Sequence, residues 1–369
     1  MSDVSALFTS ARIGAHDIPN RIVMAPMTRV RADVEGRVSA STAEYYAQRA
    51  SGGLLITEAT QVLPNGKGGR GTPGIHNDEQ VAAWREVTDR VHSAGGRIFL
   101  QLWHTGRAAH PSFLPQGEEV VSASAIAIEG DVFTPAGRVR YAIPRALTLD
   151  EIPRYVQAYA SAARNAIAAG FDGVEIHAAN GYLIDQFLRD GSNHRTDSYG
   201  GSIENRGRFL LEITRAVVDA IGAEKVGVRL SPTNAFQSMK DSDPAALFGY
   251  AASALAPFGL AYLHLLEPIL STHPSYDTEG RVLAPTMRAA FGGPLILNGG
   301  YDAVSAAAAI ADGRAELIAF GVPYLANPDL PERLRTGAPL NSPDFATFYS
   351  GGDSGYADYP TLDAVESAA

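Results

Sequence analysis

Short apolar runs recur along the chain, and each is followed by a polar or glycine-containing turn and then by a longer segment with helical periodicity. Eight such runs lie between about residue 20 and about residue 337. They occupy residues 21–27, 53–59, 97–103, 172–178, 225–231, 261–267, 294–300 and 316–322. The repeating unit predicted by this pattern is a strand, a loop and a helix.

Strands that are apolar almost throughout predict a parallel sheet buried on both faces. Eight strand–helix units fit a closed (β/α)8 barrel better than an open sheet, so we expect an α/β fold of the TIM-barrel type. A capping-box-like sequence at 148–151 predicts a helix to about residue 169, and a second helix is expected over about 202–221. We expect one domain over 1–369, with the barrel over about 20–337 and the segment 338–369 packed near the active site.

One segment breaks this rhythm. Roughly 45 residues, 104–147, separate the third strand from the next predicted helix. A loop of that length in a compact domain is usually a lid or a binding element. We therefore expect this extended loop to cap the barrel mouth.

Composition narrows the class of protein. The chain of 369 residues is 46% hydrophobic and 19% charged, which is typical of a globular protein. A formal net charge of -10 disfavours nucleic acid and anionic membranes as partners, and the absence of cysteine excludes disulfides and thiolate metal sites. The N-terminal residues lack a basic segment followed by an apolar signal core, so we expect a cytoplasmic protein.

Several familiar motifs are absent or stand in the wrong context. Residues 66–71, GKGGRG, match G-x-G-x-x-G, but Thr-Pro-Gly follows and continues the loop, which favours a βα loop over a dinucleotide site. No histidine pair has metal-ligand spacing, so we expect no metal. We interpret His16, His92 and His264 as surface or core residues. No G-x-S-x-G elbow is present, which argues against the usual α/β serine hydrolase.

Polar residues gather instead at the carboxyl ends of the predicted strands, where the active sites of barrel enzymes lie. Any one of them, taken alone, is more often a structural hydrogen-bonding group than a functional one. Their convergence on one rim of the barrel is harder to explain structurally. The members of this set are Thr28, Gln101, Trp103, His177, Arg229 and the glycines that close the last two strands.

The arginine and the glycines point to an anionic ligand. Arg229 lies inside an apolar run, and a buried guanidinium needs an anionic partner, either a distant carboxylate or a ligand. Strands seven and eight end in NGG at 298–300 and FGV at 320–322, which are similar to phosphate-binding turns. Together these features predict a phosphorylated cofactor across the barrel mouth.

A cluster of hydrogen-bonding side chains follows strand four. His177 and Asn180 are close enough in sequence to face one side, and two neutral donors aimed at one oxygen would polarise a carbonyl or nitro group. Tyr182 can approach the same cavity if the strand end is irregular. Its weakly acidic phenol would suit protonation of an enolate-like carbon.

The chain resembles the old yellow enzyme family of FMN-dependent ene-reductases, in particular the bacterial maleimide, nitrate-ester and morphinone reductases. The resemblance runs through most of the sequence, and several motifs occur in the family order. They are RIVMAPMTR (21–29), QLWHTGR (101–107), HAANGY (177–182), NHRTDSYGGSIENR (193–206), VGVRLSP (226–232), ANPDLPERL (326–334) and FYSGGDSGYADYPTL (348–362).

This resemblance implies an eight-stranded barrel that holds FMN noncovalently. Thr28 would contact flavin O4, and Arg229 would offset negative charge near N1 and O2 of the reduced ring. His177 and Asn180 match the pair that binds the activating group of the substrate, and Tyr182 matches the proton donor. The other implied cofactor residues are Pro26, Met27, Ala59 and Gln101 around the ring, and Gly299, Gly300 and Gly321 at the phosphate, with Val322 next to them.

The substrate pocket is implied in the same way. Trp103 and Tyr349 match its aromatic walls. Two positions depart from the family pattern. Gly69 stands where an aromatic residue is usual, so the pocket is either wider there or closed by Arg70. Val322 stands where the family often has an arginine that helps to hold the phosphate.

The implied reaction is a ping-pong reduction. NAD(P)H reduces FMN and leaves, and an electron-poor alkene then receives hydride from N5 at Cβ and a proton at Cα, from Tyr182 or solvent. Nitrate esters, nitroaromatics or quinones are the alternative oxidants, and a barrel that binds FMN without turnover is a third possibility. The expected partners are small molecules, with the protein a monomer or homodimer.

Overall fold

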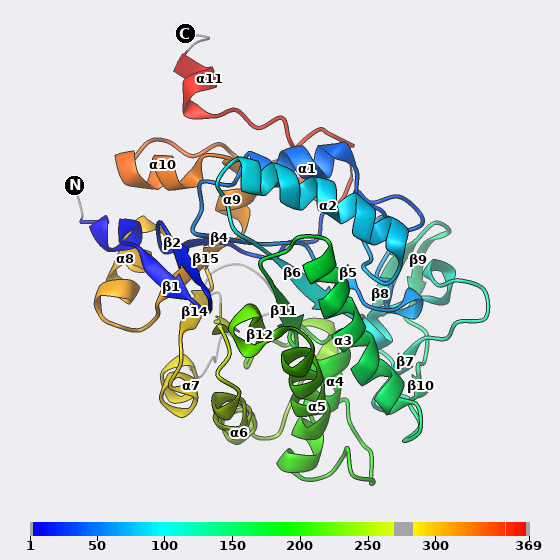
Figure 1. Cartoon of the computed structure of the whole chain (residues 1–369). Helices are drawn as coiled ribbons and strands as arrows, with labels where there is room; N and C mark the ends of the chain where they lie inside the picture. Colours follow the sequence, from blue (N-terminus) through cyan, green and yellow to red (C-terminus); the bar gives the residue numbers. More distant parts are fainter. Residues whose placement is uncertain (1–2, 269–282, 351, 367–369) are drawn as a thin grey trace.

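The computed structural model describes residues 3–268, 283–350 and 352–366, and it confirms the predicted barrel (Figure 1). Eight parallel strands form one sheet that closes where β11 pairs with β6. They are β3 (Ile22–Met24), β4 (Leu54–Ile56), β6 (Ile98–Trp103), β11 (Gly173–His177), β12 (Val226–Leu230), β13 (Tyr262–Leu266), β14 (Leu295–Asn298) and β15 (Leu317–Phe320). Each lies within one of the eight predicted runs.

Helices surround the sheet in Figure 1, and the last of them, near the C-terminus, extends away from the barrel. They are α1 (Ala40–Ala47), α2 (Asp78–Ser93), α3 (Ile152–Ala168), α4 (Leu183–Leu188), α5 (Ile203–Ile221), α6 (Pro244–Leu255), α7 (Ala284–Phe291), α8 (Ala303–Ala311), α9 (Val322–Ala326), α10 (Leu330–Thr336) and α11 (Leu362–Glu366). In the part of the chain that the structure describes, none of these helices is long and apolar enough to cross a membrane.

The two helices predicted by capping signals both form. Helix α5 matches its predicted bounds, and Ser202 accepts a hydrogen bond from the backbone N–H of Asn205 at its start. Helix α3 begins later than the predicted capping box. The capping-box bond itself forms, because Glu151 accepts from the backbone N–H of Thr148, and the backbone N–H of Ile152 donates to the carbonyl of Thr148, so a single turn leads from residue 148 into the helix.

Alternation along the strands sorts side chains between two regions. One set, such as Leu100 and Val228, packs outward into the main core cluster shared with the helices. The other set points into the barrel, where Val23, Leu54, Phe99 and Tyr262 form a second apolar cluster. Nearer the carboxyl ends, the inward positions are polar. The barrel therefore has an apolar lower half and a polar upper half.

A small hairpin, β1 (Ala11–Ile13) and β2 (His16–Ile18), adds Ile13 and Ile18 to the apolar cluster inside the barrel. Nearby, His16 and His92 both contact Asp172, His92 through a 2.9 Å bond from Nε2 to the carboxylate. These two histidines are thus structural, as predicted.

The long loop 104–147 carries short elements of its own. They are β7 (Val121–Ser122), which pairs with β10 (Arg145–Ala146), and the antiparallel hairpin β8 (Asp131–Thr134) and β9 (Gly137–Arg140). In Figure 1 the β8–β9 hairpin and the β1–β2 hairpin lie on opposite sides of the molecule. The further two-residue strand β5 (Thr60–Gln61) pairs with β6 beside it. Residues of the loop line the cavity described below, so the expected cap is present.

Candidate active site

A cavity of about 1040 Å³ opens at the carboxyl ends of the barrel strands. The structure brings nearly all the predicted site residues to its wall. They are Pro26, Met27, Thr28, Ala59, Gly69, Arg70, Gln101, Trp103, His177, Asn180, Tyr182, Arg229, Gly300, Gly321, Val322 and Tyr349. Gly299, which the structure also describes, is not among the lining residues; a Cβ there would meet the backbone of Glu267 at 3.1 Å.

A buried carboxylate that the sequence analysis did not identify lies behind Gln101; we call Glu175, Gln101 and His264 the floor of the site, and of these three Gln101 alone lines the cavity. Glu175 accepts hydrogen bonds from Gln101 Nε2 at 2.7 Å and from His264 Nδ1 at 2.8 Å, and all three residues are buried. Burial alone would raise the pKa of Glu175, but the charge and hydrogen bond of His264, the charge of Arg229 and the Gln101 bond together lower it. An ionised carboxylate only accepts, so the amide nitrogen of Gln101 faces Glu175 and its carbonyl oxygen faces away.

Arg229 lies one strand further round the barrel, in register with His177 on one side and His264 on the other. It is 5% exposed and donates from Nη2 to Asn298 Oδ1 at 2.8 Å. Its charge also reaches Glu175, where it favours the ionised carboxylate. Arg229 therefore has a carboxylate within electrostatic range, that of Glu175, and it also lines the cavity.

His177 ends β11 and is a neutral hydrogen-bond donor. Burial, Arg229 and His264 hold its pKa well below the ordinary value. Its Nδ1 lies 3.3 Å from the backbone nitrogen of Ala179, and because that N–H can only donate, Nδ1 must accept. The proton of the neutral ring is therefore on Nε2, which leaves an N–H donor at the cavity.

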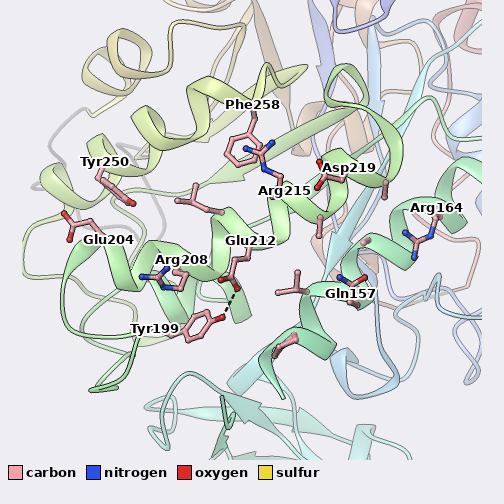
Figure 2. A pocket seen from close by; sticks show the side chains of 16 residues that line it. Gln157, Arg164, Tyr199, Glu204, Arg208, Glu212, Arg215, Asp219, Tyr250 and Phe258 are labelled. Carbon is pink, nitrogen blue, oxygen red and sulfur yellow. Dashed lines mark hydrogen bonds between the residues drawn. The ribbon is translucent and has the colours of Figure 1, made fainter. Parts of the chain in front are cut away.

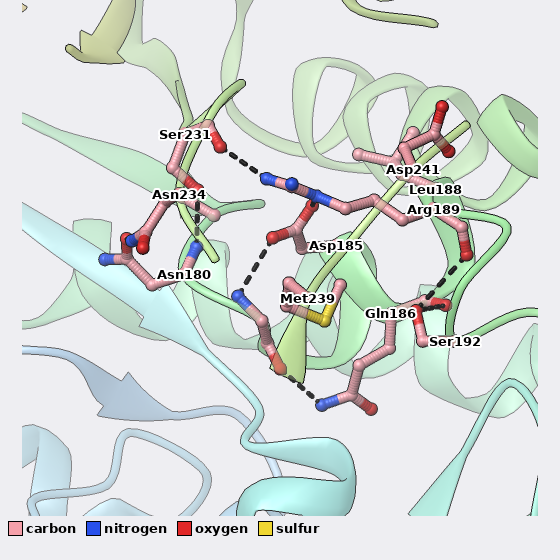
Figure 3. Close-up of polar contacts among 12 residues, drawn as sticks. Asn180, Asp185, Gln186, Leu188, Arg189, Ser192, Ser231, Asn234, Met239 and Asp241 are labelled. Carbon is pink, nitrogen blue, oxygen red and sulfur yellow. Dashed lines mark hydrogen bonds and ion pairs between the residues drawn. The ribbon is translucent and has the colours of Figure 1, made fainter. Parts of the chain in front are cut away.

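The chain turns sharply after this strand. Asn180 and Gly181 have φ values of 56° and 75°, in the left-handed region that glycine and asparagine tolerate best. Figure 3 shows how the turn is held. Ser231 Oγ accepts from the backbone N–H of Asn180 at 2.7 Å, and Asp185 accepts from that of Gly181 at 2.9 Å.

A buried ion pair supports this turn from behind. Arg189 donates from Nε to Asp185 at 2.8 Å and from Nη2 to the carbonyl of Ser231, so one guanidinium joins α4 to the end of β12 (Figure 3). Gln186 donates to the carbonyl of Gly181 at 2.7 Å. The irregular strand end that the sequence analysis required for Tyr182 is thus present and supported.

Tyr182 comes immediately before α4 and lines the cavity. Its ring makes edge-to-face contacts with His177 and with Trp103, each at a centroid distance of 5.0 Å. Burial raises the pKa of Tyr182 well above the ordinary value, and the nearby tyrosines act in the same direction. The hydroxyl is therefore protonated at neutral pH.

The mouth is formed by loops. A Cβ at Gly68 would lie 2.3 Å from the indole of Trp103, so glycine allows the loop to approach this side chain closely. A Cβ at Gly69 would meet only Thr72, at 4.0 Å, and Arg70 is exposed. The wall is therefore open at position 69, and residues 67–74 begin no helix, as predicted for a βα loop.

Apolar side chains lie around this mouth. Phe133 from the β8–β9 hairpin is 74% exposed, Tyr349 is 66% exposed and Phe236 is 41% exposed, and all three line the cavity. Such a gathering of exposed aromatic groups is typical of a site that receives an apolar ligand.

The C-terminal segment reaches the cavity because two arginines bind its backbone. Arg29 and Arg31 both donate to the carbonyl of Phe348, and Arg31 also donates to the carbonyls of Thr347, Ser350, Gly352 and Ser354. This contact brings Phe348 and Tyr349 to the cavity wall. The assignment of the whole chain to one domain stays a prediction.

A second hollow, of about 1010 Å³, lies on the outside of the barrel over α3, α5 and α6 (Figure 2). Its wall carries charges of both signs, including Arg208, Arg215 and Asp219, and Tyr199 donates to Glu212 at 2.8 Å. No predicted site residue lines it.

Comparisons with known proteins agree with this geometry. Residues 6–341 match the family described as NADH:flavin oxidoreductase / NADH oxidase. The chain is 47% identical to the chanoclavine-I aldehyde reductase of Penicillium roqueforti, over 96% of each chain. It is 46% identical to a probable flavin mononucleotide-dependent alkene reductase of Leishmania infantum, over 95% of this chain and 96% of the relative.

Solved structures give the same result. The old yellow enzyme homologue from Zymomonas mobilis has a TM-score of 0.94 and 46% identity, covering 96% of this chain and 99% of the other. Morphinone reductase has a TM-score of 0.91 and 47% identity, covering 97% and 96%. The barrel and its site thus define an FMN-dependent NAD(P)H oxidoreductase. The chain belongs to the old yellow enzyme family, with structural neighbours among the bacterial ene-reductases.

Proposed function

We propose that this enzyme reduces the activated C=C bond of α,β-unsaturated carbonyl or nitro compounds. The observation that carries the proposal is the neutral N–H donor of His177 at the cavity, with the Asn180 amide and the protonated hydroxyl of Tyr182 in the same cavity wall. A substrate oxygen bound between two N–H donors gains stabilisation as negative charge develops on it during the reaction.

The residues present fit FMN. When bound, FMN carries hydride from NAD(P)H to the alkene. Gln101, whose carbonyl oxygen is turned away from Glu175, would accept from a ring N–H, and Arg229 would stabilise negative charge on the ring. Around the ring we place Pro26, Met27, Thr28 and Ala59, and near the phosphate Gly300, Gly321 and Val322; Gly299, which does not line the cavity, would act only through the turn that it forms with Gly300.

The phosphate end depends on the backbone more than on side-chain charge. A Cβ at Gly321 would come no closer than 3.7 Å to Met27, so the approach to this backbone is open. Val322 is 38% exposed and supplies no charge. Backbone N–H groups at strands seven and eight would therefore bind the phosphate, as they do in many barrels.

His177 and Asn180 would orient the substrate, and Tyr182 would deliver the proton to Cα. A phenol with a raised pKa is a poor acid toward water but can protonate a strongly basic carbon. The aromatic groups of Trp103 and Tyr349 would exclude water from one side of the substrate.

The oxidant preference can be tested directly. The holoenzyme is reduced anaerobically with NADPH, and flavin reoxidation is then followed after addition of cyclohexenone, a maleimide or a nitrate ester. Reoxidation by the enone and the maleimide at rates that match turnover would support the proposal. Reoxidation only by the nitrate ester would replace it with nitrate-ester reduction, and a flavin that neither NADPH nor NADH reduces would reject both.

Replacing Tyr182 with phenylalanine tests the proton donor. The variant keeps the ring contacts with His177 and Trp103, so we expect flavin reduction by NAD(P)H to be retained. Alkene turnover should fall by about 10²-fold, the lower range for general acid catalysis. Unchanged turnover and product stereochemistry would show that solvent supplies the proton.

A further inference from the structure

We propose that Asn234 is a positioning residue that fixes the direction of the Asn180 side-chain amide, so that its NH2 group and not its carbonyl faces the substrate. The inference rests on the proposed function, because it assumes that Asn180 binds the substrate oxygen. Asn234 itself, which the structure describes, does not line the cavity and would act only through Asn180.

The direction of the Asn234 amide is set by the backbone N–H of Phe236, which can only donate a hydrogen bond. The backbone N–H of Phe236 lies 2.8 Å from Asn234 Oδ1. A backbone N–H donates and never accepts, so the atom facing it must be the carbonyl oxygen of the Asn234 amide. The Asn234 amide therefore presents its NH2 group on its other side.

That NH2 group meets Asn180. Asn234 Nδ2 lies 2.7 Å from Asn180 Oδ1, so the Asn180 carbonyl is occupied as an acceptor. The backbone N–H of Phe236 thus fixes the direction of the Asn234 amide, and the Asn234 amide in turn fixes the direction of the Asn180 amide. The remaining atom, Asn180 Nδ2, is a donor, and Asn180 lines the cavity.

The segments that carry the two asparagines are held in place. Asn234 is 4% exposed, and the backbone N–H of Asn180 is held by Ser231, three residues before Asn234. Figure 3 shows Asn180 and Asn234 side by side, with the Ser231 contact beside them. Arg107 also donates to the carbonyl of Gln237, which ties down the loop after Asn234.

An asparagine without such a contact can present either end of its amide. The flipped amide would place a carbonyl oxygen against the oxygen of the substrate, which removes a donor and adds repulsion between two acceptors. His177 would then be the only donor of the pair. Asn234 would therefore contribute to selectivity for ligands that accept hydrogen bonds.

The variant Asn234→Asp separates this role from a structural one. Aspartate can accept from the Phe236 N–H as asparagine does, so the local turn is kept, but an ionised carboxylate cannot donate to Asn180. The Asn180 amide should then turn its NH2 group toward residue 234 and its carbonyl toward the cavity.

The readout is ligand binding to the oxidised holoenzyme, followed by the change in flavin absorption. Cyclohexanone, an acceptor, and cyclohexanol, which can also donate, are the two probes. In Asn234→Asp we expect the Kd ratio of ketone to alcohol to rise about tenfold, equivalent to one hydrogen bond. Asn234→Ala, which adds no charge, should give an intermediate ratio because both amide directions become available.

Two outcomes would overturn the inference. One is an unchanged ratio in Asn234→Asp, and the other is a change in Asn234→Ala alone, as a purely structural role would give. The variant Asn180→Ala identifies failure of the proposed function instead. If it leaves ketone binding unaltered, Asn180 does not bind the substrate oxygen; if it weakens ketone binding while the Asn234→Asp ratio is unchanged, only the role of Asn234 fails.

Discussion

The floor and the rim of the cavity orient their polar side chains by different means. On the floor, the ionised carboxylate of Glu175 determines which way Gln101 and His264 point. On the rim, backbone N–H groups do so, that of Ala179 for His177 and that of Phe236, through Asn234, for Asn180. Charge organises the part of the site that lies inside the barrel. Neutral peptide groups orient the side chains that line the cavity, His177 and Asn180.

This difference has a physical reason. A buried carboxylate is tolerated only with several donors around it, so replacing any residue of the floor leaves another polar group without its partner and lowers the stability of the fold. The rim needs donors whose strength does not vary with pH, and neutral groups directed by the backbone supply them. We therefore expect changes on the floor to affect folding, and changes on the rim to affect it less.

The largest effect should follow from Glu175→Gln. The glutamine amide offers one acceptor and one donor, so either Gln101 must turn its amide or His264 must change tautomer to stay paired, and the negative charge near Arg229 is lost. We expect the free energy of unfolding, measured with urea, to fall by about 3 kcal/mol. Glu86→Gln, at an exposed position on α2, is the matched control and should stay within about 0.5 kcal/mol. Equal effects of the two variants would remove the distinction between floor and rim.

A smaller, pH-dependent effect is expected at His177. Its folded-state pKa is lowered, so below about pH 6.5 the unfolded chain takes up a proton that the folded protein does not, and stability falls as pH falls. Between pH 6.5 and pH 5, the free energy of unfolding should fall by about 2 kcal/mol less in His177→Asn than in the wild type. Urea unfolding at several pH values measures this. His194→Asn, at an exposed position, is the matched control; a wild-type slope in His177→Asn would mean that the pKa of His177 is not lowered in the folded protein.

The smallest effect should come from Ser231→Ala. This change removes the acceptor for the backbone N–H of Asn180 and leaves Glu175 and its partners untouched. We expect a loss of about 1 kcal/mol in the free energy of unfolding, the usual cost of one hydrogen bond. Ser161→Ala, on the exposed face of α3, serves as the control. A loss as large as that of Glu175→Gln would show that the rim is as tightly coupled as the floor.

The sequence predicted the barrel because eight apolar runs carry a signal that depends only on local periodicity. It also predicted the rim residues, since parallel strands place their carboxyl ends at one edge and His177, Arg229 and Gln101 all lie near such ends. The position of Gly299 away from the cavity wall depends on how Glu267 packs, which the pattern does not show.

The floor and the role of Asn234 were missed for related reasons. Glu175 stands two residues before His177, so alternation places both inside the barrel, but this signal was not used. Its contact with His264 depends on strand register, which brings together residues 89 positions apart. The contact of Asn234 with Asn180 spans 54 positions and joins two irregular loops, for which sequence periodicity gives no prediction.

The contacts of Arg31 with the carbonyls of Thr347, Ser350, Gly352 and Ser354 have a consequence for the order in which the chain folds. All eight barrel strands are translated before this stretch, so the barrel can assemble while one wall of its catalytic chamber is still to be made. A nascent chain that has folded its barrel therefore still lacks the part of the cavity wall that Phe348 and Tyr349 form. Tyr349 completes the cavity wall only when the segment that carries it, which is translated after the barrel, binds to Arg31.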